Sequence, residues 1–430
     1  MAEFKTVRGM RDFLPDEARL LRYVEGTARQ VAGLYGFKEI VTPVVEPYEL
    51  LSAKAGEEIK SRMFKFKDLG ERDIALRPEF TASVARLVAT TFRTEPRPFR
   101  LFSVGSVYRY DEPQKGRYRE FWQSNYELMG TAKPEADAEI ILVTNSLMAK
   151  AGVKGFAFKV GHVGVLRGIF NQEKLSDRVQ DSVMQLMDKK EYDDAFRVIE
   201  NAGASDKCVS VLRGLVELKG KNVFELVSRI KECVKDYEAS SSAAENLGAI
   251  LKLVKASGCE VDLTVEAGFA RGLEYYTGMI FEVNLPDLDV ALGGGGRYDK
   301  LIELYGGEPT PAVGVAHGLD RIMLALQMQK ASVVEAKEGI NVAVIPVKEE
   351  LNGEALKLAQ TLRDAEIIVE VEVMGRKMTK ALEDADRRKL DYAVIVGERE
   401  LKEEAVVVRD LKTRQQNTVP IRRLVETLKA

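Results

Sequence analysis

Apolar and polar residues follow one another with two different spacings, and each spacing predicts a kind of element. Over residues 14–35 apolar side chains recur every three or four positions, which predicts an amphipathic helix ended by Gly36. Residues 37–51 then form an extended segment. Its Pro43 and Pro47 cannot donate to a central ladder, so this segment is expected at a sheet edge or an interface. The helical pattern rests on Leu20, Leu21, Val24, Ala28 and Val31.

Two strand patterns flank a polar loop further along the chain. Residues 73–92 predict a strand followed by a helix that begins near Pro78 or Glu79. Residues 99–110 and 121–130 have the pattern of two strands, and the loop between them carries clustered arginines, a glutamine and carboxylates. The pattern predicts a long antiparallel hairpin with a charged tip.

The character of the sequence changes twice, and each change suggests a domain boundary. Residues 171–257 are helical and mostly polar, and strand patterns resume at residues 260–285, so this stretch is expected to be an insertion. After a polar linker, strands and helices alternate, which indicates a small separate α/β domain. The predicted domains are residues 1–170 and 258–330 together, the helical insertion 171–257, and the C-terminal domain 339–430.

Composition changes this picture little. The chain has 430 residues, too many for one core, with a net charge of −3 and 45% hydrophobic residues, as in ordinary soluble proteins. A nearly balanced net charge does not indicate a nucleic-acid-binding protein, although local basic patches could still bind nucleic acid. No apolar run is long enough to cross a membrane and no signal-peptide core is present, so a cytoplasmic protein is expected.

Cysteines and histidines are few. Cys208, Cys233 and Cys259 are too far apart for a closed zinc site or a disulfide framework, so free thiols and no metal site are expected. The two histidines, His162 and His317, are expected to serve packing. A mechanism that depends on a histidine base is therefore disfavoured.

Arginines occur where phosphate chemistry would need them. Arg109 and Arg271 are embedded in strand-like apolar runs, where an unpaired charge is costly, and Arg321 begins an apolar helix. Each alone could be a solvated charge or a surface ion pair. Together they suggest a polyphosphate ligand, because a guanidinium group binds phosphate with two parallel donors. The glycine run at residues 293–296 lacks the lysine and hydroxyl residue of a phosphate loop, and it favours close approach of a backbone or a flat ligand.

Several of these segments together resemble the histidyl-tRNA synthetase family, a class II aminoacyl-tRNA synthetase family. Residues 36–47, 107–127 and 312–324 resemble the three class motifs, and "LRPEFTA", "RGLEYYTG" and "GGGGRYDKL" resemble signatures of the histidyl family. The resemblance runs from about Val7 to the C-terminus, and the helical insertion contributes least to it. Phe80 and Glu274 depart from the usual glycine and aspartate, which leaves the local shape near residue 80 open.

The resemblance implies an α+β fold class. The expected catalytic domain is an antiparallel sheet of the class II synthetase type with a helical insertion, followed by a C-terminal α/β anticodon-binding domain. It also implies a homodimer formed through the first motif. The implied partners are L-histidine, ATP and tRNA(His), and the implied activity is that of a histidine–tRNA ligase with Mg²⁺ accompanying ATP. The attacking group would be the carboxylate of histidine, already ionised at neutral pH, so no enzyme base is needed.

The resemblance also assigns site residues. Arg109, Arg271 and Arg321 are the expected catalytic cations, because developing charge on the α-phosphate needs preorganised donors. ATP would be bound by Arg109, Arg117 and Arg321. Histidine would be bound by Glu79, Phe80, Thr81, Arg109, Gln123, Glu127, Arg271, Tyr275 and Tyr276. Glu127 is the expected acceptor beneath the imidazole ring, and Tyr276 is its expected hydroxyl partner.

From the residues alone, Gln123, Asn125 and Glu127 share one face of a strand, which fits a wet sheet surface or a site equally well. The family reading also places Gln114, Lys115 and Arg119 at the tRNA acceptor end. Lys377, Lys380, Arg387 and Arg388 are candidates for tRNA contacts in the C-terminal domain, or ordinary surface charges. The alternative function is a catalytically silent relative that acts as a regulatory or tRNA-sensing subunit, and the intact set of arginines disfavours it.

Overall fold

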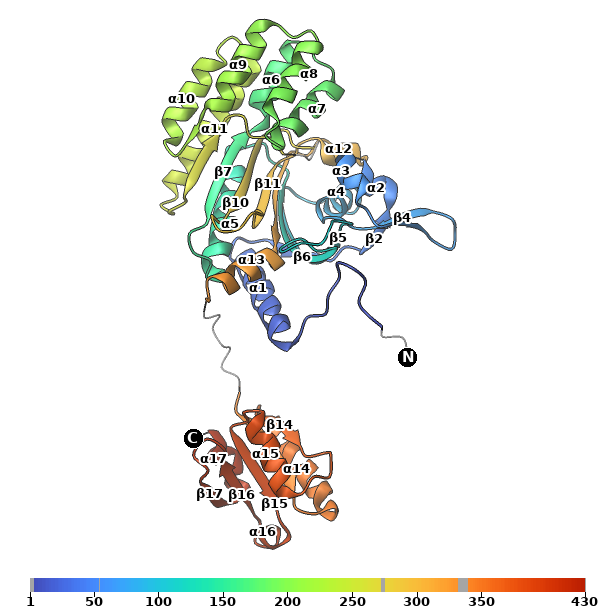
Figure 1. The fold of residues 1–430 in the computed structure, drawn as a ribbon, viewed down its shortest axis with the longest axis vertical. Helices are drawn as coiled ribbons and strands as arrows, with labels where there is room; N and C mark the ends of the chain where they lie inside the picture. The colour runs from blue at the N-terminus through green and yellow to red at the C-terminus, as the bar shows by residue number, and fades with distance from the viewer. Residues whose placement is uncertain (1–3, 54, 272–274, 332–338, 430) are drawn as a thin grey trace. The chain divides into compact units, whose positions relative to one another are not determined.

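A computed structural model describes residues 4–53, 55–271, 275–331 and 339–429. The chain divides into two units, residues 1–333 and 334–430. Figure 1 shows both units as ribbons. No helix among the described residues is long and apolar enough to cross a bilayer.

The first unit is built on a mixed sheet of nine strands. Only the pairs β1–β5 and β7–β9 are parallel in this sheet, and the others are antiparallel. In spatial order the strands are β1 (Lys38–Glu39), β5 (Phe99–Tyr108), β6 (Glu120–Met129), β12 (Ala312–Gly318), β11 (Gly293–Arg297), β10 (Met279–Asn284), β7 (Ala157–His162), β9 (Leu263–Glu266) and β8 (Lys219–Gly220).

The predicted hairpin is confirmed as β5 and β6, and its register fixes which side chains share a face. Glu127 on β6 lies opposite Leu101 on β5 and Gly314 on β12. Gly314 in turn lies opposite Gly296 on β11. Because side chains alternate along a strand, these positions form one row across the sheet.

A smaller sheet of three strands lies beside the large one. Its order is β2 (Val45–Pro47), β4 (Asp73–Leu76) and β3 (Lys65–Lys67). Residues 37–51 were predicted to lie at a sheet edge or an interface because of Pro43 and Pro47. Both strands of this segment are edge strands: β1 in the large sheet, and β2, which ends at Pro47, in the small one.

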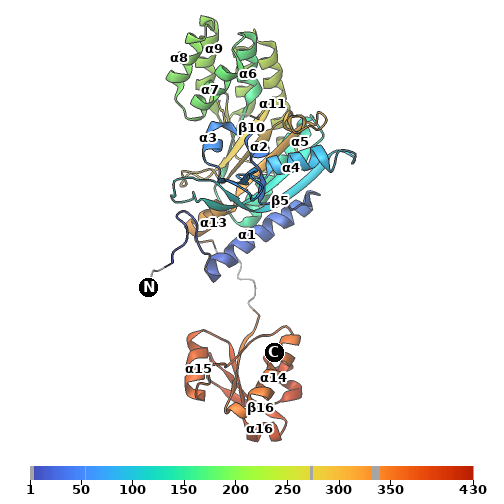
Figure 2. The ribbon, with the colours of Figure 1, turned by 90° about the vertical axis from the view of Figure 1, so that its right-hand side faces the viewer.

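Helices cover one face of the large sheet, where α1 runs beside the strands (Figure 2). This face is packed by α1 (Pro15–Leu34), α5 (Pro134–Ala151) and α13 (Leu319–Met328), and Tyr126 of β6 donates its hydroxyl to the Ala28 carbonyl oxygen of α1 at 2.8 Å. The shorter helices are α2 (Tyr48–Ser52), α3 (Gly56–Ser61), α4 (Thr81–Thr90) and α12 (Leu301–Leu304). The helix predicted near Pro78 or Glu79 is confirmed as α4, two to three residues later than expected.

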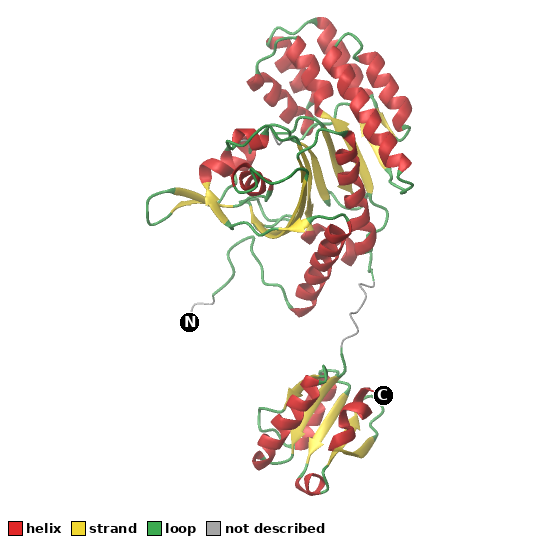
Figure 3. Ribbon diagram, turned by 180° about the vertical axis from the view of Figure 1, so that it is seen from behind, coloured by secondary structure: helices red, strands yellow, loops and turns green. Residues whose placement is uncertain are grey.

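The polar helical stretch forms a bundle of its own. Figure 3 shows these helices grouped at one end of the large sheet. Its buried residues continue the apolar core of the first unit. The predicted insertion boundary at residue 171 falls inside α6, which packs against α11. The bundle comprises α6 (Val163–Gln172), α7 (Asp177–Asp188), α8 (Tyr192–Asn201), α9 (Asp206–Glu217), α10 (Val223–Cys233) and α11 (Glu238–Ala256).

The second unit is a five-stranded sheet with apolar clusters on both faces. Val342 and Val344 of β13 face one cluster, and Ala343 and Ile345 face the other. The sheet order is β14 (Ile368–Val371), β13 (Asn341–Pro346), β15 (Tyr392–Val396), β16 (Ala405–Asp410) and β17 (Gln416–Pro420), and its helices are η1 (Glu349–Leu351), α14 (Asn352–Asp364), α15 (Met378–Arg387), α16 (Glu398–Lys402), η2 (Ile421–Arg423) and α17 (Leu424–Lys429). The alternation of strands and helices predicted for this part is confirmed, and β17 is an additional strand.

Candidate active site

A cleft of about 420 Å³ opens on the face of the large sheet opposite α1, α5 and α13. Strands β6, β10, β11 and β12 contribute to it, as do the loop at the tip of the hairpin and the start of α13. The site residues predicted from sequence that line it are Glu79, Thr81, Arg109, Arg117, Gln123, Arg271, Tyr275, Tyr276 and Arg321.

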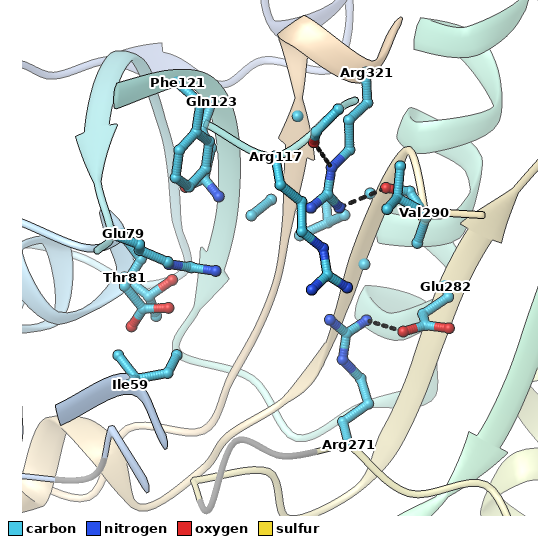
Figure 4. Close-up of a pocket in the computed structure, with 18 of the residues that line it drawn as sticks. Ile59, Glu79, Thr81, Arg117, Phe121, Gln123, Arg271, Glu282, Val290 and Arg321 are labelled. Atoms are coloured by element: carbon cyan, nitrogen blue, oxygen red, sulfur yellow. Dashed lines mark hydrogen bonds and ion pairs between the residues drawn. The ribbon is translucent and has the colours of Figure 1, made fainter. Parts of the chain in front are cut away.

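Guanidinium groups from distant parts of the chain converge in this cleft. Figure 4 shows the side chains of Arg117, Arg271 and Arg321 pointing toward one another, opposite Glu79 and Thr81. Burial, and after it the positive charges of Arg109, Arg117 and Arg271, lower the pKa of Arg321 to about 10. The neighbouring positive charges thus disfavour the ionised form of Arg321, and an anionic ligand in the cleft would relieve this repulsion.

Backbone carbonyl groups orient these arginines. Arg109 donates through Nε to the Pro78 carbonyl oxygen at 2.9 Å. Arg321 donates through Nε to the Gly116 carbonyl oxygen at 3.2 Å and through Nη1 to that of Ala291 at 2.7 Å. Neutral oxygens hold the guanidinium groups without cancelling their charge, so the charge stays available to a ligand.

Arg271 forms an ion pair with a carboxylate of the cleft. Its Nη1 lies 3.5 Å from Oε1 of Glu282 and donates to the Phe281 carbonyl oxygen at 3.0 Å. Glu282 is shared with Lys159, whose Nζ lies 3.0 Å from the other carboxylate oxygen. Asp188, which also lines the cleft, and Glu282 both favour the ionised form of Arg271.

Glu127 forms a buried acceptor next to the arginines. Thr81 donates its hydroxyl to Oε1 of Glu127 at 2.8 Å, and the hydroxyl of Tyr298 donates to Oε2. Burial raises the pKa of Glu127 to about 7, against the effect of these two donors. Nearby, Tyr275 donates to Oε2 of Glu79 at 3.2 Å, and burial raises the pKa of Glu79 as well.

Gln123 stands on the same face of β6 with an unsatisfied acceptor. Its Oε1 is buried and has no hydrogen-bond partner among the described residues. A buried amide oxygen without a partner costs free energy unless a ligand or water supplies a donor. A wet sheet surface is therefore excluded for Gln123, Asn125 and Glu127, because all three are buried, and their role in a site stays a prediction.

Glycines form the floor under these side chains. A Cβ on Gly294 would lie 1.8 Å from Nη1 of Arg271, and a Cβ on Gly314 would lie 1.7 Å from Oε2 of Glu127. A Cβ on Gly296 would lie 3.0 Å from Cδ1 of Tyr276. The glycine run thus allows other groups to come close to its backbone, as its composition predicted. Side chains of the protein itself, those of Arg271 and Tyr276, lie against it.

A family model described as histidyl-tRNA synthetase matches residues 9–322, and one described as anticodon binding domain matches residues 341–430. A protein of Methanococcus maripaludis named histidine–tRNA ligase is 41% identical over 98% of this chain and 99% of its own length. One of Saccharolobus solfataricus with the same name is 37% identical over 100% and 99%. The chain belongs to the histidyl-tRNA synthetase family.

The solved structure of a histidyl-tRNA synthetase from Nostoc sp. PCC 7120 has the same fold. It superposes with a TM-score of 0.77 over 100% of this chain and 99% of that one, at 24% identity. The predicted fold class is confirmed, with a sheet-based first unit and a C-terminal unit that matches an anticodon-binding domain.

Five of the residues assigned through the family resemblance lie outside the cleft lining: Phe80, Gln114, Lys115, Arg119 and Glu127. Phe80 is buried in the core beneath the guanidinium group of Arg77, 4.1 Å from its ring centre, so its side chain does not face the cleft. Glu127 is buried next to the cleft, where Thr81 and Tyr298 of its lining donate to the carboxylate. Arg119 is buried and stacks on Tyr110 at 3.6 Å, unlike the solvent-facing position that a tRNA contact requires.

Gln114 and Lys115 do lie exposed at the tip of the hairpin loop, where Gln114 and Arg117 pair through their backbones. The departure at Glu274 falls outside the described residues. Both histidines serve packing, as predicted. His162 accepts from the Gly164 N–H at the start of α6, and His317 is buried between Ser124 and Thr144.

Tyr298 and Asp320 are site residues that the sequence analysis did not single out. Tyr298 follows the glycine run and contacts Glu127, and Asp320 precedes Arg321 and accepts from the Trp122 N–H at 2.6 Å. Both stand inside recognised motifs. Their roles depend on partners more than a hundred residues away, which no local pattern reveals.

Proposed function

We propose that this protein is a histidine–tRNA ligase. It would join L-histidine to ATP, forming histidyl-adenylate and pyrophosphate, and then transfer histidine to the 3′ end of tRNA(His). The observation that carries this proposal is the convergence of Arg109, Arg117, Arg271 and Arg321 beside the buried acceptor Glu127. Full-length relatives named histidine–tRNA ligase support it.

In the first step, a carboxylate oxygen of histidine bonds to the α-phosphorus of ATP. The bond from that phosphorus to the bridging oxygen breaks, and pyrophosphate leaves with the electron pair. Arg109 and Arg271 stabilise charge on the α-phosphate, while Arg117 and Arg321 bind the outer phosphates. Each preorganised donor of this kind contributes about 3–4 kcal/mol to the transition state.

Histidine is recognised by groups that match its two ring nitrogens. Glu127 accepts the N–H of a neutral imidazole, and the hydroxyl of Tyr276 partners the other nitrogen. Glu79, Thr81 and Gln123 hold the ammonium and carboxylate groups, and the free Oε1 of Gln123 suits an ammonium donor. A ligand that lacks either ring nitrogen leaves a buried group unpaired and is rejected.

In the second step, a hydroxyl of the terminal ribose attacks the carbonyl carbon of the adenylate, AMP leaves, and the hydroxyl proton is released. Gln114 and Lys115 at the loop tip contact the acceptor end of the tRNA. In the second unit, Lys377, Lys380, Arg387 and Arg388 are exposed and supply candidate contacts. Of these, Arg387 and Arg388 also pair with Asp384.

Magnesium accompanies ATP in this proposal and neutralises part of the polyphosphate charge. Among the described residues, no three histidine, cysteine or acidic side chains are grouped to hold a metal ion. Glu282, a carboxylate of the cleft, is already paired with two cations. The ion would therefore be held mainly by phosphate oxygens and water, as Mg²⁺ commonly is. A homodimer formed through residues 36–47 and a cytoplasmic location complete the proposal.

The test is pyrophosphate exchange into ATP by the purified full-length protein. We expect exchange with histidine and none with threonine or proline. Arg271→Ala should lower kcat/KM for exchange about 100- to 1,000-fold, since one preorganised cation is lost. The control, Arg197→Ala, removes an exposed arginine of α8 and should leave exchange unchanged. Equal exchange with threonine or proline would contradict the assignment and place the protein in a neighbouring synthetase family. No exchange with histidine would favour the silent regulatory subunit.

A further inference from the structure

Tyr298 is placed more rigidly than its position in a loop after β11 suggests. Its N–H donates to the Ala312 carbonyl oxygen at 2.7 Å, and its ring meets that of Tyr275 edge-on with centroids 5.6 Å apart. The preceding Arg297 forms an ion pair with Asp137, and both side chains are buried. The following Asp299 is fixed through its own N–H, which donates to the Thr277 hydroxyl at 3.0 Å.

This anchoring aims one hydroxyl at one carboxylate. Tyr298 is 2% exposed, and its hydroxyl donates to Oε2 of Glu127, while Thr81 occupies Oε1. Gly314, opposite Glu127 across the strand pair, leaves the space in which the carboxylate lies flat. Glu127 therefore has a donor on each oxygen and keeps its remaining lone pairs for a ligand in the cleft.

We propose that Tyr298 is a positioning residue that keeps Glu127 ionised and oriented, so that the site presents a fixed acceptor to an N–H of the histidine imidazole. The proposal rests on the proposed function, because it concerns the same pocket. Tyr298 does not touch the reacting atoms. It acts through Glu127, and its role is to make that group an acceptor that cannot donate.

The physical basis is the competition between burial and hydrogen bonding. Burial favours the protonated form of Glu127, and so does the negative charge of Glu79 just before α4. Donors to the ionised form oppose both effects. The other titratable groups that face Glu127 are Tyr275 and Tyr276, whose pKa values are raised by burial. The neighbouring strands β5 and β12 present Leu101 and Gly314, which do not titrate.

A protonated Glu127 would change the specificity of the site. Its O–H would become a donor, and the pocket would then lack a strong acceptor for the imidazole N–H. Because the pKa of Glu127 lies at about 7, loss of one donor shifts the balance toward this form under ordinary assay conditions. The hydroxyl of Tyr298 is thus needed most near neutral pH.

The test is Tyr298→Phe, which removes one hydroxyl from a buried ring. At pH 7 we expect the KM for histidine in pyrophosphate exchange to rise about 10- to 100-fold, with little change in the KM for ATP. In wild type, kcat/KM for histidine should rise as pH increases through about 7. In the variant that rise should move up by about one pH unit. Comparison with wild type at each pH cancels the titration of histidine itself.

Two further variants separate positioning from a structural role. Tyr305→Phe removes a hydroxyl that donates to the Leu50 carbonyl oxygen, and it should leave the pH profile unchanged. Glu127→Gln supplies a background that cannot titrate, so Tyr298→Phe should cause no pH shift there. If Tyr298→Phe alone fails to fold, the double variant should restore folding, because it leaves no unpartnered carboxylate.

Three results would overturn the proposal. They are equal rises in the KM for histidine and ATP, an unmoved pH profile in Tyr298→Phe, and a double variant that is as unfolded as the single one. Failure of the proposed function is a separate result, since wild type itself would then lack histidine-dependent exchange.

Discussion

Gly294 and Gly314 show how strongly this site depends on the absence of side chains. A methyl group at either position would overlap a charged atom, Nη1 of Arg271 in one case and Oε2 of Glu127 in the other. Neither glycine has a positive φ, so backbone freedom does not explain them. They are needed because long side chains from other segments lie flat on the sheet.

Gly294→Ala should therefore disable the cleft while leaving the fold intact. The methyl group displaces the Arg271 guanidinium, and loss of one preorganised donor predicts a fall in kcat/KM for exchange of about 100- to 1,000-fold. The control is Gly26→Ala in α1, where a Cβ meets nothing within 4 Å. That change should stabilise the protein slightly and leave exchange unaltered. Thermal unfolding checks the fold, and near-normal exchange in Gly294→Ala would contradict the account.

For single residues, the sequence predicts which charged side chains need a ligand better than it predicts which residues touch each other. Arg109, Arg271 and Arg321 could be singled out because a cation in an apolar segment needs an anion. Tyr298 could not, since a tyrosine after a strand is unremarkable until its partner across the sheet is known. Arg119 is assigned to the tRNA acceptor end by the family resemblance, but Tyr110 and the N-terminal segment bury it, and spacing along a loop does not reveal such contacts.

Among the elements, the segment 8–13 before α1 binds the hairpin loop to α13. The Gly9 carbonyl oxygen accepts from the Arg119 N–H at 2.8 Å. Arg11 lies over the ring of Tyr118 at 3.6 Å and forms an ion pair with the buried Asp320. Asp320 directly precedes Arg321, so this segment connects two elements that line the cleft.

Arg11→Ala should thus affect ATP more than histidine. Removing the guanidinium leaves Asp320 buried without its cation and loosens both the loop and the start of α13. We expect the KM for ATP to rise about tenfold or more, with a smaller change for histidine. Arg8→Ala is the matched control, because its ion pair with Glu112 is exposed and contributes little. Equal changes in both KM values would show a general loss of structure instead.

Helices and strands were predicted correctly where the apolar pattern was long. The prediction failed where contacts with distant segments decide where an element begins or whether it forms. The hairpin of β5 and β6 follows from two long strand patterns around a polar loop. Helix α4 begins at Thr81 and not at Pro78, and the Pro78 carbonyl oxygen accepts a hydrogen bond from Arg109, a contact from a distant segment. The strands β8 and β17 are short or exposed, and their sequences lack a clear apolar alternation.

In the whole molecule, the residues assigned to the two small substrates are confined to one of the two units. Every residue assigned to ATP or histidine lies within residues 1–333, and the apolar clusters of the second unit are its own. The domain at residues 339–430 was predicted from the change in sequence pattern, and the second unit begins at residue 334. Chemistry and part of the tRNA recognition are therefore expected to be separable.

A fragment of residues 1–333 should retain histidine-dependent pyrophosphate exchange within about tenfold of the full chain, since its apolar core is complete. Transfer of histidine to tRNA should fall much further, because the basic side chains of the second unit are gone. Exchange and charging measured side by side check this. A fragment that folds but loses both activities equally would contradict it, and circular dichroism shows whether it folds.

The burial of both histidines has a consequence for experiments on the substrate. Burial lowers the pKa of His162 to about 4 and that of His317 to about 3. Neither ring should therefore change charge between pH 6 and pH 9, so the imidazole signals of the protein should not shift with pH in this range. A bound histidine can then be followed directly through its own ring signals, and the enzyme becomes a clean background against which the tautomer of its substrate is visible.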